Sequence, residues 1–262
     1  MPALRTGARW LTRPARRVAL PVPRGYGRGL RVHLGQSNLT RLIRSGEPRA
    51  ERTFLEVLEP GDVVYDVGAN IGWYSMLAAR RVGPGGGRVV AFEPGKDNAA
   101  CIERNARTNR LSNISVVVAA VSDRDGFATF LDRGSLESRL DKDDDADQAR
   151  RRAARKEDSR GSATVPVLSL DTWIARHQQP PPTLIKIDVE GGEIGALRGM
   201  LGTLRSARPT LIIELHGTQR AVADLLDGAA YEHRPIEREL PTRDAPWWVH
   251  VLARPRPGER GP

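Results

Sequence analysis

The sequence predicts an α/β fold with a mostly parallel central sheet. Short apolar runs rich in Val, Ile and Leu alternate with segments of helix length, which is the pattern of strands buried on both faces between crossover helices. A glycine-rich turn follows the first strong run directly, at the strand end where sheets of this kind bind ligands. The 262 residues are enough for one such domain with short appendages.

The expected elements follow each other in regular order. A first helix is predicted over 47–59, where Phe54 and Leu58 lie on one helical face and Pro60 then ends it. Two strands near the C-terminus are joined by a proline-containing loop, so we expect them to be antiparallel to each other. The other predicted elements are strands at 63–67, 88–92, 114–120, 164–167, 184–187 and 211–213, helices at 73–81 and 99–108, and those last two strands at 231–236 and 247–252.

Three segments stand outside this regular pattern. Residues 1–46 are rich in Arg, Gly and Pro and are interpreted as a partly disordered lead, or as a short hairpin around 30–34. Residues 132–162 are dense in charge and lack an apolar stripe, which predicts a mobile surface insertion. The main folded domain is therefore expected over 47–254, followed by a disordered tail at 255–262.

The charge balance is strongly basic. A net charge of +9 raises nucleic acid, membrane surfaces and acidic substrates as partners. Lysine occurs at only four positions, however, and the remaining basic residues are arginines in a chain rich in Ala, Gly and Pro. This skew favours a general composition bias with solvated segments, so we expect no nucleic-acid partner.

Cysteine and hydropathy set the expected compartment. Cys101 is the single cysteine, which excludes an intrachain disulfide and favours a packing role. No stretch approaches the roughly 20 apolar residues that a membrane span needs. The arginine-rich N-terminus lacks a signal-peptide core, so the expected location is the cytoplasm. The oligomeric state is not determined by the sequence.

The turn after the strand 63–67 is the sharpest local signal. It reads Asp66-Val67-Gly68-Ala69-Asn70-Ile71-Gly72, and its glycines allow a ligand to approach the backbone at the start of a helix. A dinucleotide site favours G-x-G-x-x-G, whereas this turn has another spacing and begins with a carboxylate. The next strand ends at Glu93-Pro94, where an acid can accept hydrogen bonds from both hydroxyls of a ribose.

Further motifs follow in a recognisable order. Besides the turn and Glu93-Pro94, the chain contains Asn105, Asn109, Ala120-Val121-Ser122-Asp123, Ser169-Leu170-Asp171, Ile185-Lys186-Ile187-Asp188-Val189-Glu190-Gly191 and Glu214. Together these motifs resemble the FkbM family of methyltransferases over about residues 47–252. The Lys-Ile-Asp-Val-Glu-Gly block is the most specific of them.

The resemblance implies a fold, a cofactor and a set of cofactor-binding residues. The fold is that of class I methyltransferases, a Rossmann-like three-layer sandwich with seven strands in the order 3-2-1-4-5-7-6, of which only strand 7 is antiparallel. The cofactor is S-adenosyl-L-methionine. By the family pattern, Asp66, Gly68, Asn70 and Gly72 line its methionine part, Glu93 with Pro94 holds its ribose, and Ala120, Val121, Ser122 and Asp123 meet its adenine.

The strand at 184–187 leads into the candidate catalytic residues. Strand alternation places Lys186, Asp188 and Glu190 on one side if the extended backbone continues. A hydroxyl acceptor must lose its proton, and a carboxylate is a suitable general base. The alternative interpretation is a buried Lys186–Asp188 ion pair with Glu190 capping the next helix. His216, with Glu214, is a secondary candidate for base or acceptor orientation.

Two neighbouring features are given weaker roles. Glu214, His216, Asp188 and Glu190 can converge, but they lack the His/Cys spacing of a closed metal site, so no metal is expected. Trp247 and Trp248 precede a strand, and we expect them to pack, with an acceptor wall as the other interpretation.

The leading functional hypothesis is O-methylation of a hydroxyl on a sugar or secondary-metabolite scaffold, with carboxylate assistance. N-methylation is the variant that the motifs leave open. Two hypotheses from other classes are a nicotinamide-dependent oxidoreductase on a similar sheet and a basic nucleic-acid-binding protein. The absence of G-x-G-x-x-G and of a Tyr-x-x-x-Lys pair argues against the oxidoreductase. Steep salt dependence of binding would identify the nucleic-acid binder.

Overall fold

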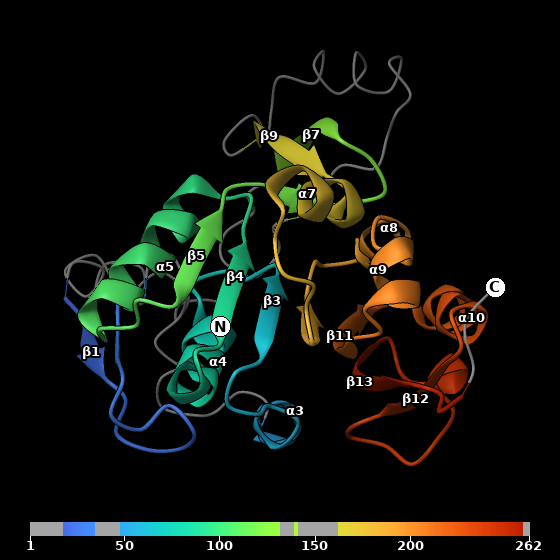
Figure 1. The fold of residues 1–262 in the computed structure, drawn as a ribbon, viewed down its shortest axis with the longest axis horizontal. Coiled ribbons are helices and arrows are strands. Elements are labelled where there is room, and N and C mark those ends of the chain that lie inside the picture. Colours follow the sequence, from blue (N-terminus) through green and yellow to red (C-terminus); the bar gives the residue numbers. More distant parts are fainter. Residues whose placement is uncertain (1–17, 35–47, 132–138, 141–161, 259–262) are drawn as a thin grey trace, which may run out of the picture.

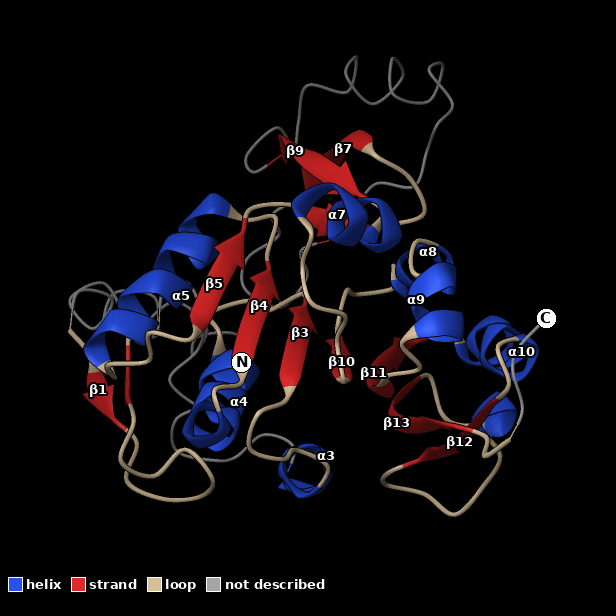
Figure 2. Cartoon of the chain, viewed as in Figure 1, coloured by secondary structure: helices blue, strands red, loops and turns tan. Residues whose placement is uncertain are grey.

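The structure is a computed structural model that describes residues 18–34, 48–131, 139–140 and 162–258. Most of the predicted charged insertion and the ends of the chain lie outside these residues. Within them the chain forms a seven-stranded sheet covered by helices and a smaller sheet of four short strands (Figure 1, Figure 2).

The large sheet has the order β12-β13-β11-β10-β3-β4-β5. Numbered along the chain, this is the order 3-2-1-4-5-7-6 that the family resemblance implies. Strand β13 is antiparallel to both of its neighbours, whereas the pairs β11–β10, β10–β3, β3–β4 and β4–β5 are parallel. The strands are β3 (Val63–Val67), β4 (Arg88–Phe92), β5 (Ile114–Val117), β10 (Leu184–Ile187), β11 (Thr210–His216), β12 (Tyr231–Pro235) and β13 (Trp248–Pro255).

Helices cover both faces of this sheet and complete three layers. The first face packs against the helices α3 (Pro48–Glu56), α4 (Trp73–Val82) and α5 (Lys96–Thr108). The second face packs against α7 (Leu170–His177), α8 (Glu193–Arg198), α9 (Leu201–Ser206) and α10 (Gln219–Gly228). Two short 3-10 turns, η1 (Gly83–Gly85) and η2 (Thr242–Asp244), lie in connecting loops.

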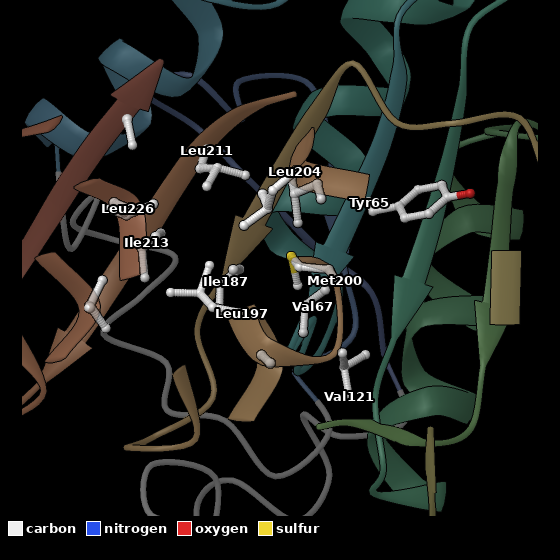
Figure 3. Close-up of a cluster of buried hydrophobic side chains, with 14 of the residues drawn as sticks. Tyr65, Val67, Val121, Ile187, Leu197, Met200, Leu204, Leu211, Ile213 and Leu226 are labelled. Atoms are coloured by element: carbon white, nitrogen blue, oxygen red, sulfur yellow. The ribbon is translucent and has the colours of Figure 1, made fainter. Parts of the chain in front are cut away.

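Strand alternation divides the core into two clusters. Tyr65, Val67 and Ile187 pack toward α7–α10, together with Leu197 of α8 and Met200 from the turn between α8 and α9 (Figure 3). The alternate residues of the strands face the opposite layer of helices. There Val64, Val89, Leu184 and Ile212 pack against Phe54 of α3 and Met76 of α4. The central strands β3, β4, β10 and β11 are therefore largely buried on both faces, as their continuous apolar runs in the sequence predict.

The predicted strand at 114–120 is wrong as a single element. It divides into β5 and β6 (Ala120–Val121), separated by a tight turn in which the Ala119 amide donates to the Val117 carbonyl. β6 belongs to the small sheet, whose order is β6-β9-β7-β8. The apolar run continues across the turn because both strands are partly buried, so hydropathy alone did not reveal the break. The other strands are β7 (Gly126–Leu131), β8 (Arg139–Leu140) and β9 (Ser162–Leu168).

Part of the arginine-rich lead packs onto the domain. Strands β1 (Leu20–Pro21) and β2 (Arg31–Val32) pair antiparallel. Two asparagines of the family pattern hold β2 against α5: Asn109 bonds both the amide and the carbonyl of Arg31, and Asn105 accepts from the His33 amide. The Asn105 side chain also donates to the Ile71 carbonyl in the glycine turn. These asparagines therefore join the hairpin, α5 and the turn.

Candidate functional site

The glycine turn after β3 is fixed by close backbone contacts. The amides of Gly68 and Ala69 both donate to the Phe92 carbonyl at the end of β4, each at 3.0 Å. Gly68 has φ +81°, and a Cβ atom there would lie 1.8 Å from the main-chain oxygen of Asp188. Only glycine fits this position, because the end of β10 approaches the turn directly. The turn therefore brings the ends of β3, β4 and β10 together.

Substitution of Gly68 tests this close approach. We expect Gly68→Ala to reduce the free energy of unfolding by more than about 3 kcal/mol, because the methyl group overlaps backbone in addition to the unfavourable φ. Gly86 has a similar φ of +79° but open space around its Cβ position. Gly86→Ala should therefore cost only about 1 kcal/mol, the strain of the left-handed backbone alone. Urea unfolding measures both, and equal losses would contradict the contact.

Asp66 begins the turn and is almost completely buried. Its Oδ2 accepts from the Ser75 hydroxyl at 2.5 Å, whereas its Oδ1 is buried with no hydrogen-bond partner among the described residues. Burial raises the pKa of Asp66, and the opposite charge of Lys186 and the Ser75 hydrogen bond reduce this shift. A buried carboxylate oxygen without a donor is a position that a ligand donor can satisfy.

Glu93 lies at the end of β4 and turns toward the same loop. Its Oε2 accepts from the Asn70 amide and its Oε1 from the Gly95 amide, each at 2.8 Å. Burial raises the pKa of Glu93 to about 7. The hydrogen bonds from these two amides oppose the rise, whereas the nearby Asp66 carboxylate adds to it. The Asn98 side-chain amide is a third, longer donor, 3.5 Å from Oε1. A carboxylate has about four acceptor positions, so Glu93 retains capacity for a ligand hydroxyl. The structure therefore brings the turn and both predicted acids together.

The remaining cofactor candidates lie beside Glu93 or at the end of β5. Pro94 follows Glu93 directly and is half-buried. Ala120 and Val121 form β6, and the Ser122 amide donates to the Leu168 carbonyl of β9. The exposed Asp123 lies 3.5 Å from the guanidinium of Arg124. The segment 120–123 thus follows β5. This strand lies beside β4, the strand that ends next to Glu93.

Lys186 and Asp188 form the ion pair that the sequence offered as one interpretation. The Lys186 ammonium is buried 3.1 Å from Asp188 Oδ2 and 4.4 Å from the centre of the Tyr74 ring. Lys186 is also the partner of Asp66 in the β10–β3 register. The pair therefore lies directly beside the glycine turn.

Glu190 reaches this region by a route that strand alternation does not predict. The extended backbone ends with β10 at Ile187, and Glu190 has a left-handed φ of +49°. It does not cap α8, whose start has no side-chain cap. Instead its carboxylate lies 3.5 Å from His216 Nε2, with the side chain 34% exposed. Burial raises the pKa of Glu190 to about 7, although the positive charge of His216 lowers it.

His216 lies among three carboxylates at the end of β11. Its Nδ1 is 2.9 Å from Glu193 Oε1, and its Nε2 is 3.3 Å from Glu214 Oε1 and 3.5 Å from Glu190 Oε2. Burial alone lowers the pKa of His216, but hydrogen bonds to Glu193 and Glu214 outweigh it and raise the pKa to about 10. His216 is thus an imidazolium at neutral pH, with both nitrogens as donors.

Glu214 connects this group to β13. Trp248 Nε1 donates to its Oε1, and its Oε2 lies 3.4 Å from His250 Nε2. Burial opposes ionisation, but the hydrogen bonds from His216 and His250 hold the pKa of Glu214 well below its ordinary value. This low pKa favours the ionised form of Glu214 at neutral pH. We refer to Lys186, Asp188, Glu190, Glu193, Glu214 and His216 as the polar cluster.

Three residues of the polar cluster are close enough to bind a cation. One ligand atom each from Asp188, Glu214 and His216 lies within 4.8 Å of the others. The positive charges of Lys186 and the His216 imidazolium already compensate these carboxylates. We therefore assign no metal ligand here.

Comparison with known proteins agrees with this geometry. The model of the Methyltransferase FkbM domain matches residues 66–241, well over half of the chain. The chain belongs to the FkbM methyltransferase family. The match begins at Asp66 and contains every residue of the glycine turn and the polar cluster.

Two curated relatives lie in this family. The hexuronic acid methyltransferase AglP of Haloferax volcanii is 30% identical over 172 residues, which are 65% of this chain and 63% of AglP. The 31-O-demethyl-FK506 methyltransferase FkbM of Streptomyces tacrolimicus is 31% identical over 187 residues, 64% of this chain and 71% of that protein. The chain thus spans somewhat less than two thirds of AglP.

A solved structure supports the fold of this FkbM-family chain. The O-methyltransferase from Bacillus cereus, solved in complex with SAH, superimposes with a TM-score of 0.50 over 79% of this chain and 80% of its own. Its sequence identity is only 13%, so the similarity concerns the fold. In the described part of the chain, no helix combines the length and the apolar character needed to cross a membrane.

Sequence reasoning did not select several residues that contact the candidate site. Glu193 is fully buried and accepts from His216, from the Gly191 amide and from the Thr218 hydroxyl. Ser75 bonds Asp66, and Tyr74 lies against Lys186. The signal available for Glu193 was a third acid directly after Gly191-Gly192. Ser75 and Tyr74 gave none, because their roles depend on how α4 packs on β3 and β10.

Proposed function

We propose that this chain binds S-adenosylmethionine and methylates a hydroxyl oxygen of a sugar or a secondary metabolite. The proposal rests on one observation above all. The buried carboxylates of Asp66 and Glu93 flank a glycine turn whose Gly68 position admits no side chain, directly beside a second group of acids. Family membership gives the reaction class, and these two acids suit a nucleoside with a positively charged amino acid attached.

The geometry of the turn supports the cofactor residues proposed here. The unpartnered Oδ1 of Asp66 suits the α-ammonium group of the methionine part, with Gly68, Asn70 and Gly72 providing backbone. The remaining acceptor capacity of Glu93 suits a ribose hydroxyl. The segment 120–123, next to Glu93 across the strand ends, is the proposed adenine contact.

When bound, S-adenosylmethionine supplies an electrophilic methyl group, which is transferred in line as its bond to sulfur breaks. The residues of this chain must then orient the acceptor and remove its proton. We assign proton removal to Glu190. It is the most exposed of the four carboxylates in the polar cluster, and its pKa of about 7 suits a base at neutral pH.

The other members of the polar cluster suit positioning roles. His216 is already protonated, so it can donate a hydrogen bond to the acceptor but cannot take its proton. Asp188 is engaged by the Lys186 ammonium, and Glu193 is fully buried behind His216. No metal ion is assigned to this mechanism. A cytoplasmic site of action, without nucleic acid as partner, belongs to the same proposal.

The test is direct binding of the cofactor. Calorimetry of the full chain with S-adenosylmethionine and with its demethylated product should show one site for each in the micromolar range. NADH serves as the control nucleotide and should not bind, because the turn lacks pyrophosphate-binding geometry. Binding of NADH without binding of either sulfur compound would reject the proposal.

A further inference from the structure

A cavity of about 490 Å³ lies next to the polar cluster. It is bounded by the first turn of α3, the loop after β12 and the start of β13, and its lining includes Arg49, Arg238, Pro246 and Trp248. Trp248 is shared between the cavity and the cluster, since its indole N–H donates to Glu214. A molecule in the cavity would therefore contact a residue that binds the cluster directly.

Two tryptophans near the cavity are exposed and yet held in place. Trp247 is 67% exposed and Trp248 42% exposed, so the expectation that this pair packs in the interior is wrong. The Trp247 ring meets the His216 ring edge-on at 5.9 Å, and the Trp248 ring meets His250 edge-on at 5.2 Å. Fixed, exposed indoles are suited to ligands that present an apolar face and polar edges, as a pyranose ring does.

The cavity is lined by two arginines and one acid, Glu237. Arg49 and Arg238 are both exposed and line it. Arg49 is positioned by a 3.0 Å hydrogen bond to the Glu237 carbonyl. The Glu237 carboxylate itself is engaged by His250, through its amide at 3.1 Å and its Nδ1 at 2.7 Å. Both guanidinium groups therefore retain donors for an anion, and guanidinium pairs with carboxylate through two parallel hydrogen bonds.

We propose that this cavity binds an acidic sugar unit of the acceptor, with the sugar carboxylate paired to Arg49 and Arg238 and the ring against Trp248. This inference rests on the proposed function and narrows its acceptor class to uronic-acid-containing glycosides. Trp248 would link the bound sugar to the polar cluster, because its indole donates to Glu214 and it pairs with His216 in the β11–β13 register.

The test compares two methyl glycosides that differ only in charge. The full chain saturated with the demethylated cofactor product is titrated with methyl β-D-glucuronide and with methyl β-D-glucoside, followed by saturation-transfer NMR. We expect the glucuronide to bind at least tenfold more tightly, because a charge-assisted bidentate pair contributes about 1.5–3 kcal/mol. The Arg49→Gln/Arg238→Gln double variant should lose this preference and keep its affinity for the cofactor product.

Controls separate this inference from the proposed function. Arg234→Gln removes an exposed arginine of β12 that does not line the cavity, and it should leave the preference intact. Equal binding of both glycosides, or a preference that survives the double variant, would overturn the acidic-sugar site while the cofactor still binds. Tighter binding of glucose 6-phosphate than of the glucuronide would overturn the carboxylate assignment. Failure to bind the cofactor product would instead reject the proposed function.

Discussion

Glu190→Gln should reduce kcat by a factor of about 10² to 10⁴, the usual contribution of a positioned general base. Its affinity for the cofactor should change little, because Glu190 lies at His216 and not at the glycine turn. Glutamine retains the size of the side chain and can still accept a hydrogen bond from His216, so the fold is kept. The measurement is formation of the demethylated cofactor product with the fastest acceptor of a panel of neutral and acidic methyl glycosides.

The pH profile adds a second readout to this prediction. Glu190 must be ionised to accept a proton, and its pKa is about 7, so kcat should rise from pH 6 to a plateau above pH 8. The groups that face Glu190 are Asp188, Glu193, Glu214 and His216, and the His216 imidazolium remains charged until about pH 10. Glu190→Gln should abolish the rise near pH 7. Glu239→Gln, at an exposed position in the loop after β12, is the matched control. A normal kcat in Glu190→Gln would assign the proton to another group.

The fold could be predicted from the sequence wherever burial controls it. The strands β3, β4 and β10 are buried on both faces, so their apolar runs marked them within a residue or two. The division of 114–120 between two sheets could not be predicted in this way. It depends on a turn at Ala119 and on pairing of β6 with β9, more than 40 residues later in the chain. Hydropathy records burial and not the partner strand.

The candidate site shows the same difference between local and tertiary information. Asp66, Gly68 and Glu93 belong to short motifs at strand ends, so spacing along the chain was enough to place them together. The charge state of His216 depends on Glu193 and Glu214, which come from other elements and surround it only in the fold. Sequence could nominate His216 as a base, whereas the geometry makes it a donor. Glu190 was selected for a strand alternation that the structure does not contain, yet its left-handed turn brings it to the same cluster.

Glu93→Gln should weaken S-adenosylmethionine binding by at least about 30-fold, or about 2 kcal/mol, since a charged acceptor of ribose hydroxyls becomes neutral. Glutamine is preferable to alanine here, because its oxygen can still accept one of the two amides of Asn70 and Gly95. Calorimetry gives the affinity, and circular dichroism confirms the fold. Asp97→Asn removes an exposed negative charge in the first turn of α5 and should leave the affinity unchanged.

The pKa of Glu93 makes the same assignment testable without mutation. With a pKa of about 7 in the free protein, the Glu93 carboxylate is mostly protonated at pH 6 and mostly ionised at pH 8. If the ribose requires the ionised form, the affinity for S-adenosylmethionine should fall about tenfold from pH 8 to pH 6. Asp66, the acid nearest to Glu93, also has a raised pKa, so the decisive comparison is Glu93→Gln, which should flatten the profile. Glu190→Gln should keep it. A profile that persists unchanged in Glu93→Gln would remove Glu93 from the ribose site and assign the titration to Asp66.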